Sequence, residues 1–173
     1  MKGHVLLLSG VPGVGKSTVL RKVKQLLGQS PLRGFLTDEV RNARGQRLGF
    51  QIESIDGRSA RLADVSSRSP DRVGRYGVDV AALERVAVPA LALDERAVYL
   101  VDEIGKMECL SSAFVEAVVG LLDSDRPLIA TVAQRGAGFI ADVKRDPGAE
   151  LWQVTRENRD ELPARVVSWL GDL

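Results

Sequence analysis

The chain has 173 residues, of which 45% are hydrophobic and 27% are charged, close to the average of soluble globular proteins. This length and composition predict one domain spanning residues 1–173 and exclude disordered, coiled-coil and collagen-like chains. With 24 Lys and Arg against 23 Asp and Glu, the formal net charge of +1 indicates neither a nucleic-acid partner nor an anionic membrane surface.

The scarcity of cysteine and histidine excludes further classes of site. Cys109 is the single cysteine, so the chain has no internal disulfide and no cysteine-based metal cluster. A lone thiol is typical of a reducing compartment, and we expect a cytoplasmic protein in which Cys109 is a small buried residue. His4 has no second histidine beside it, which argues against a zinc site or a histidine-based triad. Lys2 precedes only a short apolar run without a cleavage pattern, so we expect neither a signal peptide nor a membrane span.

The first elements in chain order are a strand and a helix joined by glycines. Residues 4–9 form a continuous apolar run, which is typical of a parallel strand buried on both faces. From Val19 to Leu27 the apolar residues recur with helical spacing, and the pattern stops near Gly28.

A different pattern follows. Residues 33–62 predict an antiparallel hairpin with its turn near Arg44-Gly45 and a third short strand behind it, and residues 63–77 predict a loop. Residues 79–91 have helical spacing that Pro89 interrupts, so we expect a kinked helix or two short ones.

The second half alternates cleanly between strands and helices. The expected strands are 97–101, 127–132 and 150–155, and the expected helices are 111–122, 138–145 and 162–170. In the helix at 111–122, the residues expected to face the core are Phe114, Val115, Val118, Val119 and Leu122. Such alternation requires helical crossovers between parallel strands. The predicted fold is therefore a three-layer α/β domain with a mostly parallel central sheet and an inserted antiparallel hairpin.

A phosphate-binding loop lies between the first strand and the first helix. Residues 10–17, GVPGVGKS, match the Walker A pattern G-x-x-x-x-G-K-[ST] at every fixed position. Glycines allow the backbone N–H groups to turn inward toward phosphate oxygens, and the helix N-terminus adds partial positive charge. Lys16 then contacts the β- and γ-phosphates, and Ser17 offers its hydroxyl to Mg²⁺.

Two acidic residues follow the strand at 97–101. In P-loop enzymes an acid at this position holds the Mg²⁺, and we expect Asp102 to do so. Glu103 points in another direction, where it orients or deprotonates a water that faces the γ-phosphate.

Three further residues lie near the same edge of the predicted sheet. Lys106 is a candidate contact to the γ-phosphate, against the alternative of a solvated loop lysine. Thr131 ends the strand at 127–132 and is a second candidate, although an ordinary strand threonine is slightly favoured. Glu108 is interpreted as structural, paired with Arg41 or another arginine.

The loop after the last strand is a candidate base site. Asn158 has the chemistry to bond a base edge and Arg156 to stack on it. The alternative is that Asn158 or Asp160 caps the final helix. Arginines of the hairpin and of residues 68–75 are either a phosphate clamp on a mobile flap or, as we favour, a solvated face. They are Arg41, Arg44, Arg47, Arg68, Arg72 and Arg75.

The chain resembles the THEP-type nucleoside-triphosphatase family, which includes a human cancer-related member. The similarity is most specific in residues 102–108, DEIGKME. Weaker similarities cover GFLTDEVR at 34–41 with RLGF at 47–50, RVGRY at 72–76 with Val78-Asp79, and VTRENR at 154–159. They follow the family's order over nearly the whole chain.

The resemblance implies a P-loop NTPase fold with an added catalytic glutamate, and Mg²⁺-dependent hydrolysis of ATP, GTP and other nucleoside triphosphates. By position it implies that Asp102 serves Mg²⁺ and Glu103 activates water. The implied phosphate contacts are Gly10, Val11, Pro12, Gly13, Val14, Gly15, Lys16, Ser17 and Thr18. Ser17 stands where threonine is common in the family, and it keeps the hydroxyl.

The sequence therefore predicts a Mg²⁺-dependent nucleoside triphosphatase with broad base specificity, monomeric, with no nucleic-acid or membrane partner. Two alternatives stay open. A small P-loop kinase would use the same loop and transfer the phosphoryl group to a hydroxyl. A nucleotide-dependent switch would use turnover to move the hairpin.

Overall fold

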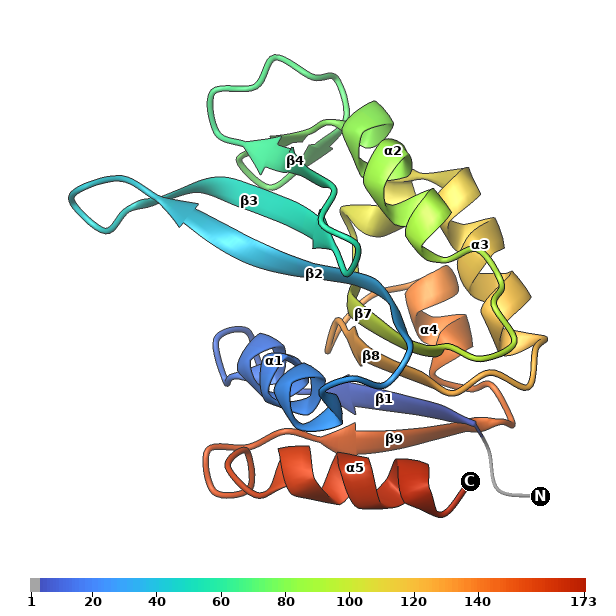
Figure 1. Ribbon diagram of the computed structural model, residues 1–173. Coiled ribbons are helices and arrows are strands. Elements are labelled where there is room, and N and C mark those ends of the chain that lie inside the picture. Colours follow the sequence, from blue (N-terminus) through green and yellow to red (C-terminus); the bar gives the residue numbers. More distant parts are fainter. Residues whose placement is uncertain (1–3) are drawn as a thin grey trace.

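Nine strands form one sheet in the computed structural model, which describes residues 4–173 (Figure 1). Lys2, which belongs to the segment considered as a possible leader, lies outside the described residues. The strands are β1 Val5–Ser9, β2 Leu32–Arg41, β3 Arg47–Ser54, β4 Ser59–Asp64, β5 Arg72–Val73, β6 Tyr76–Val78, β7 Val98–Ile104, β8 Leu128–Val132 and β9 Ala149–Gln153. The helices are α1 Lys16–Leu27, α2 Val80–Ala90, the 3₁₀ turn η1 Glu108–Leu110, α3 Ser112–Leu122, α4 Phe139–Val143 and α5 Leu162–Gly171.

The sheet is mixed, and the prediction of a mostly parallel sheet needs this correction. The strand order is β5-β6-β4-β3-β2-β7-β8-β1-β9. Strands from β2 to β9 in this order pair in parallel, whereas β3, β4, β6 and β5 pair antiparallel. β2 belongs to both halves, because Leu32–Phe35 pair with β7 and the rest of the strand continues outward beside β3. The hairpin therefore extends the central sheet and is not a separate insertion.

The predicted three layers are present. Helices α1 and α5 cover one face of the sheet, and α2, α3 and α4 cover the other (Figure 1). In β1, Leu6 and Leu8 pack in the cluster that contains α1 and α5, whereas Val5 and Leu7 pack in the cluster that contains α2 and α3. Burial on both faces explains why the sequence of this strand is apolar without alternation.

Gly34 of β2 pairs with Leu100 of β7 in a conformation that leaves no room for a side chain. A Cβ placed on Gly34 would lie 1.9 Å from the carbonyl oxygen of Leu100, and the residue has a φ of +110°. Only glycine combines this backbone conformation with this contact. The position fixes the hairpin strand against the strand that carries the acidic pair.

Three local predictions were wrong. Residues 63–77 contain the short strands β5 and β6, because their backbone pairs with the antiparallel edge of the sheet. Pro89 does not divide α2, since it lies in the last turn, one residue before the helix ends at Ala90. Val119 of α3 was expected to face the core but is 40% exposed, because the helix buries its Phe114, Val118 and Leu121 side instead.

Within residues 4–173, none of the helices combines the length and the apolar character that crossing a membrane requires.

Candidate active site

The phosphate loop joins β1 to α1, as its sequence predicts. Gly13 and Gly15 have φ angles of +79° and +114°, and Gly15 is the residue that precedes the helix. A Cβ on Gly10 would lie 2.7 Å from the carbonyl oxygen of Val154, so glycine is required there by close packing. These glycines let the loop curl at the start of α1, where free N–H groups and the helix dipole favour an anion.

Lys16 and Ser17 are the first residues of α1 and face the same cleft. The ammonium of Lys16 donates a hydrogen bond to the carbonyl oxygen of Gly10, 2.8 Å away, and so lies across the loop. A phosphate in the loop would have this ammonium within reach. Thr18 is exposed and lines the cleft beside them.

Asp102 is a buried carboxylate at the end of the apolar part of β7, with 3% of its surface exposed. Its Oδ1 accepts a hydrogen bond of 2.6 Å from the Thr131 hydroxyl, and its Oδ2 is buried without a partner among the described residues. Burial raises the pKa of Asp102, and the hydroxyls of Thr131 and Ser17 act in the opposite direction. A buried carboxylate oxygen without a partner costs free energy unless a cation or donor satisfies it.

This donor set suits Mg²⁺. The ion prefers oxygen ligands and usually takes one or two protein groups together with waters and substrate phosphates. Asp102 and the Ser17 hydroxyl supply such groups beside the phosphate loop. No cluster of three or more His, Cys, Asp or Glu side chains that could hold a metal occurs in the described part of the chain.

Glu103 follows Asp102 across a cis peptide bond and lines the cleft. Burial raises its pKa, and the negative charge of Asp102 raises it further, while Lys16 lowers it. A carboxylate with a raised pKa is a better proton acceptor near neutral pH than an ordinary glutamate. Glu103 therefore has the position and the basicity of a group that activates a nucleophile.

Glu108 is fully buried in η1, and the predicted pairing with Arg41 is wrong. Arg41 lies on the hairpin and binds Glu39, two residues earlier on the same strand face. Burial and the charge of Glu103 raise the pKa of Glu108 to about 8. Burial also raises the pKa of the neighbouring Cys109 thiol to about 12, so that this half-buried cysteine is a poor nucleophile.

The phosphate loop, the acidic pair and the hairpin border a single cleft of about 930 Å³. Lys106 lines it, is exposed, and makes no hydrogen bond or ion pair to another residue of the described chain, so it is free to meet a ligand. Thr131 lies elsewhere. Its side chain is fully buried and its hydroxyl is occupied by Asp102, which makes it a positioning residue for that carboxylate.

The loop after β9 is built around Asn158. Its side-chain oxygen accepts from the Thr155 N–H and its side-chain nitrogen donates to the Gln153 carbonyl, both at 2.8 Å. The Asn158 amide thus holds the loop together. A contact between Asn158 and a nucleotide base stays a prediction. Arg156 is exposed and borders neither of the two cavities. The final helix has no side-chain cap from Asn158 or from Asp160.

Sequence analysis assigned no role to Arg159, which the structure brings to the phosphate loop. Its guanidinium donates to the Val14 carbonyl at 3.0 Å, and its side chain lies against Gly15. Arg159 also lines a second cavity of about 260 Å³, together with Thr18 and Lys22 of α1. Its sequence position, six residues after the end of β9, gives no signal of this contact.

Arg21 and Thr37 were also missed. Arg21 of α1 donates to the Thr37 carbonyl at 2.9 Å and to Asp38 at 2.6 Å. The Thr37 hydroxyl donates to the backbone oxygen of Asp102. Through these bonds the helix behind the phosphate loop, the hairpin and the acidic strand hold one another in place.

Comparison with known proteins decides the family. A family model described as NTPase matches residues 5–167. The chain belongs to this NTPase family. It is 40% identical over 164 residues to the nucleoside-triphosphatase THEP1 of Thermotoga petrophila, covering 94% of this chain and 90% of that protein.

Two solved structures of the family have the same fold. The crystal structure of THEP1 from the hyperthermophile Aquifex aeolicus has a TM-score of 0.87 and 35% identity, covering 98% of this chain and 99% of that one. The solution structure of a human cancer-related nucleoside triphosphatase has a TM-score of 0.81 and 31% identity, covering 96% of each chain. The resemblance drawn from the DEIGKME segment is thereby confirmed.

Proposed function

We propose that this member of the NTPase family hydrolyses nucleoside triphosphates to the diphosphate and phosphate, with Mg²⁺. The observation that carries the proposal is that Lys16, Asp102 and Glu103 come together on one cleft at the start of α1. Relatives over nearly the whole chain are named nucleoside-triphosphatases, which supports the reaction class.

In this mechanism the curled loop binds the phosphates through its N–H groups, and Lys16 contacts the β- and γ-phosphates. Ser17 and Asp102 would hold Mg²⁺, which would supply a positive charge to neutralise the phosphate oxygens. Thr131 holds the Asp102 carboxylate in place. Glu103 orients a water for in-line attack on the γ-phosphate and accepts its proton, while Lys106 is free to contact the γ-phosphate oxygens.

We propose broad base specificity because the base end of the site offers little to recognise a base edge. The Asn158 amide is used within its own loop, and Arg156 lines no cavity. The side chains at the small cavity beside the loop are Thr18, Val19, Lys22, Arg159 and Asp160. Among them, the guanidinium of Arg159 can stack on the face of a purine or a pyrimidine without distinguishing between them. We propose a cytoplasmic location, since a lone thiol suits a reducing compartment. We also propose that the protein is a monomer.

The test is phosphate release from ATP, GTP, CTP and UTP with Mg²⁺, with nucleotide binding measured in parallel. We expect all four to be hydrolysed by the natural sequence. Glu103→Gln should bind nucleotide normally and lose about 10²- to 10⁴-fold in kcat, as expected for loss of a general base. Lys16→Ala should not bind any of the four nucleotides. Chelation of Mg²⁺ with EDTA should stop turnover.

The contradicting result is equally specific. A natural chain that binds all four nucleotides tightly and releases almost no phosphate does not have hydrolysis as its main reaction. Equal rates for the natural sequence and Glu103→Gln would remove the proposed role of Glu103.

A further inference from the structure

The cleft extends well past the phosphate loop. Beyond the acidic pair it continues between the hairpin and the segment after β7, where Arg47, Phe50, Leu62, Val73 and Met107 line it. We call this part the hairpin half of the cleft. No step of the proposed hydrolysis uses these side chains.

The substrate's own nucleoside does not occupy the hairpin half. In the strand order β2-β7-β8-β1-β9, the hairpin and the phosphate loop lie on opposite sides of β7. Placing the γ-phosphate beside Glu103 of β7 directs that end of the triphosphate toward the hairpin. The nucleoside is then at the other end, on the β9 side, where Arg159 and Lys22 border the smaller cavity.

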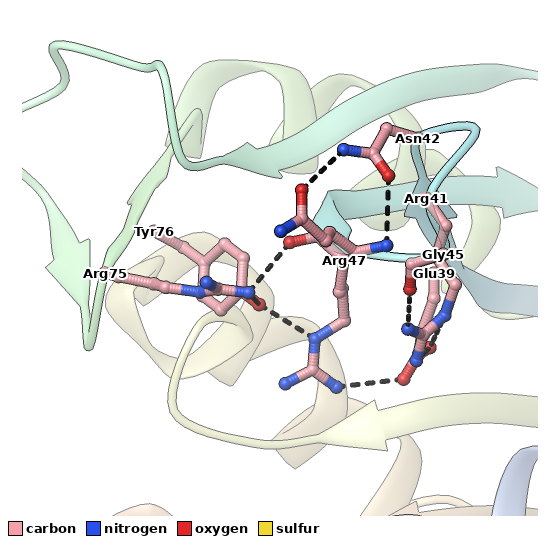
Figure 2. Close-up of polar contacts among 8 residues, drawn as sticks. Glu39, Arg41, Asn42, Gly45, Arg47, Arg75 and Tyr76 are labelled. Atoms are coloured by element: carbon pink, nitrogen blue, oxygen red, sulfur yellow. Dashed lines mark hydrogen bonds and ion pairs between the residues drawn. The ribbon is translucent and has the colours of Figure 1, made fainter.

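The guanidinium of Arg47 is fixed in the hairpin half by Tyr76 and Glu39, which lie on either side of it in Figure 2. Its Nε donates to the Tyr76 hydroxyl at 2.8 Å and its Nη1 to Glu39 at 2.9 Å. Its guanidinium carbon lies 5.2 Å from the centre of the Phe50 ring and 5.7 Å from that of Tyr76. Nη2 makes no hydrogen bond to the described protein. An arginine fixed in this way loses little entropy when it binds an anion.

The surrounding charges favour an anion. Glu39 is shared by Arg41 and Arg47, and Arg75 has no acidic partner, since it donates to the Arg47 carbonyl and the Tyr76 hydroxyl. Arg41 and Arg47 bind the single carboxylate of Glu39, and Arg75 lies beside Tyr76 (Figure 2). Of these three arginines only Arg47 lines the cleft, and the positive charges of the other two lie behind it, which favours an anion at its unbonded Nη2.

The rest of the hairpin half is apolar. Phe50 is half-buried, with a T-shaped contact to Tyr76 at 5.2 Å between ring centres, and Leu62, Val73 and Met107 also line this part of the cleft. An aromatic ring and aliphatic side chains beside a fixed guanidinium suit a flat ring that carries an anionic group.

We propose that the hairpin half of the cleft is a second ligand site, which binds a nucleoside monophosphate while a triphosphate occupies the phosphate loop. Arg47 binds the phosphate of this second ligand, and Phe50 with Val73 packs against its base. The proposal rests on the proposed function for the orientation of the triphosphate, and it assigns no chemistry to the second ligand.

The experiment is a titration of the full chain with AMP, GMP, CMP and UMP, first saturated with Mg²⁺ and the non-hydrolysable analogue AMP-PNP. We expect one monophosphate to bind per chain for at least one of the four, beside one AMP-PNP. Arg47→Ala should weaken that binding about tenfold or more and leave AMP-PNP affinity within about twofold. The matched control is Arg58→Ala, which removes an exposed arginine paired with Asp56 and should change neither.

A second variant tests the same site independently, in case Arg47→Ala does not fold. Val73→Glu keeps Arg47 and places a negative charge in the apolar lining of the cleft, where it repels a phosphate and competes for the guanidinium. It should abolish monophosphate binding while AMP-PNP still binds. Thermal melting of both variants checks that they fold.

Three results overturn the proposal. They are monophosphate binding that disappears once AMP-PNP is saturating, no binding by any of the four, and equal binding by Arg47→Ala and Arg58→Ala. Loss of ATP hydrolysis in a variant is a separate matter, because the titration needs no hydrolysis. If AMP-PNP itself does not bind, the proposed function fails, and Arg47-dependent binding of the monophosphate alone still tests the second site.

Discussion

Replacing Thr131 by valine isolates the role of a single buried hydroxyl. The two side chains have nearly the same shape, so the change removes the hydrogen bond of 2.6 Å to Asp102 Oδ1 and little else. Thr131 is fully buried and Asp102 is 3% exposed, so water has no access to replace the lost donor. Asp102 would then have both carboxylate oxygens buried without a partner, since Oδ2 already lacks one.

The magnitude follows from the charge on the acceptor. A hydrogen bond to an ionised group contributes about 1.5–3 kcal/mol, which corresponds to about 10- to 100-fold in affinity. Because the hydroxyl stabilises the ionised form of Asp102, its removal raises the pKa of this carboxyl and weakens its hold on Mg²⁺. We therefore expect Thr131→Val to need about 10- to 100-fold more Mg²⁺ for half-maximal turnover, in line with losses at residues that orient metal ligands.

The assay is phosphate release against Mg²⁺ concentration at saturating ATP. Thr131→Ser is the matched control, because it keeps the hydroxyl and loses only a methyl group, and its Mg²⁺ dependence should stay near that of the natural sequence. A folded Thr131→Val with an unchanged Mg²⁺ requirement would refute the assignment of Asp102 to the metal through this hydrogen bond.

Three further predictions concern stability and substrate binding. Gly34→Ala should lower the free energy of unfolding by more than about 3 kcal/mol in denaturant titrations, because its Cβ meets the Leu100 carbonyl oxygen at 1.9 Å. Glu108→Gln should flatten the pH dependence of stability, measured by thermal melting. Burial raises the pKa of Glu108 from 4.5 to about 8, so the folded state keeps a proton that the unfolded chain releases, and stability falls as pH rises between these values. Arg159→Ala should raise KM for ATP several-fold with little change in kcat, because it loses the bond of 3.0 Å to the Val14 carbonyl that shapes the loop.

Each of the three has a control. Gly57→Ala has a φ of +94° with no atom near its Cβ, so it should cost only the backbone strain of about 1–2 kcal/mol; an equal loss at both glycines would contradict the steric argument. Stability of Glu108→Gln that falls with pH as in the natural sequence would contradict the assignment to this residue. Arg156→Ala removes a neighbouring exposed arginine that lines neither cavity. If it raises KM as much as Arg159→Ala does, then positive charge near the loop, rather than the contact of Arg159 with Val14, is responsible.

Part of the site was predictable because its chemistry is local in sequence. The phosphate loop requires glycines, a lysine and a hydroxyl at fixed spacing between a strand and a helix, and all of these lie within residues 10–17. The acidic pair is likewise marked by the apolar strand that precedes it, and the structure brings both groups to one cleft.

Other features depend on contacts between distant residues, which a single sequence does not encode in any periodic pattern. The predicted pair of Glu108 with Arg41 failed because Glu39 is nearer to Arg41 on the same strand face, which leaves Glu108 buried without an arginine. The role of Thr131 was equally hidden, since its partner Asp102 is 29 residues away along the chain.

The sequence by itself determined the family, the order of most elements and the identity of the groups around the phosphates. All three depend on motifs and spacings between residues that are close together in the chain. Only the tertiary structure decided that the antiparallel strands continue the central sheet and that the cleft reaches from Lys16 to Arg47. The physical reason is that strand pairing and burial bring together residues far apart in the chain, and the environment made in this way sets the pKa of Glu108 and holds the guanidinium of Arg47 in place.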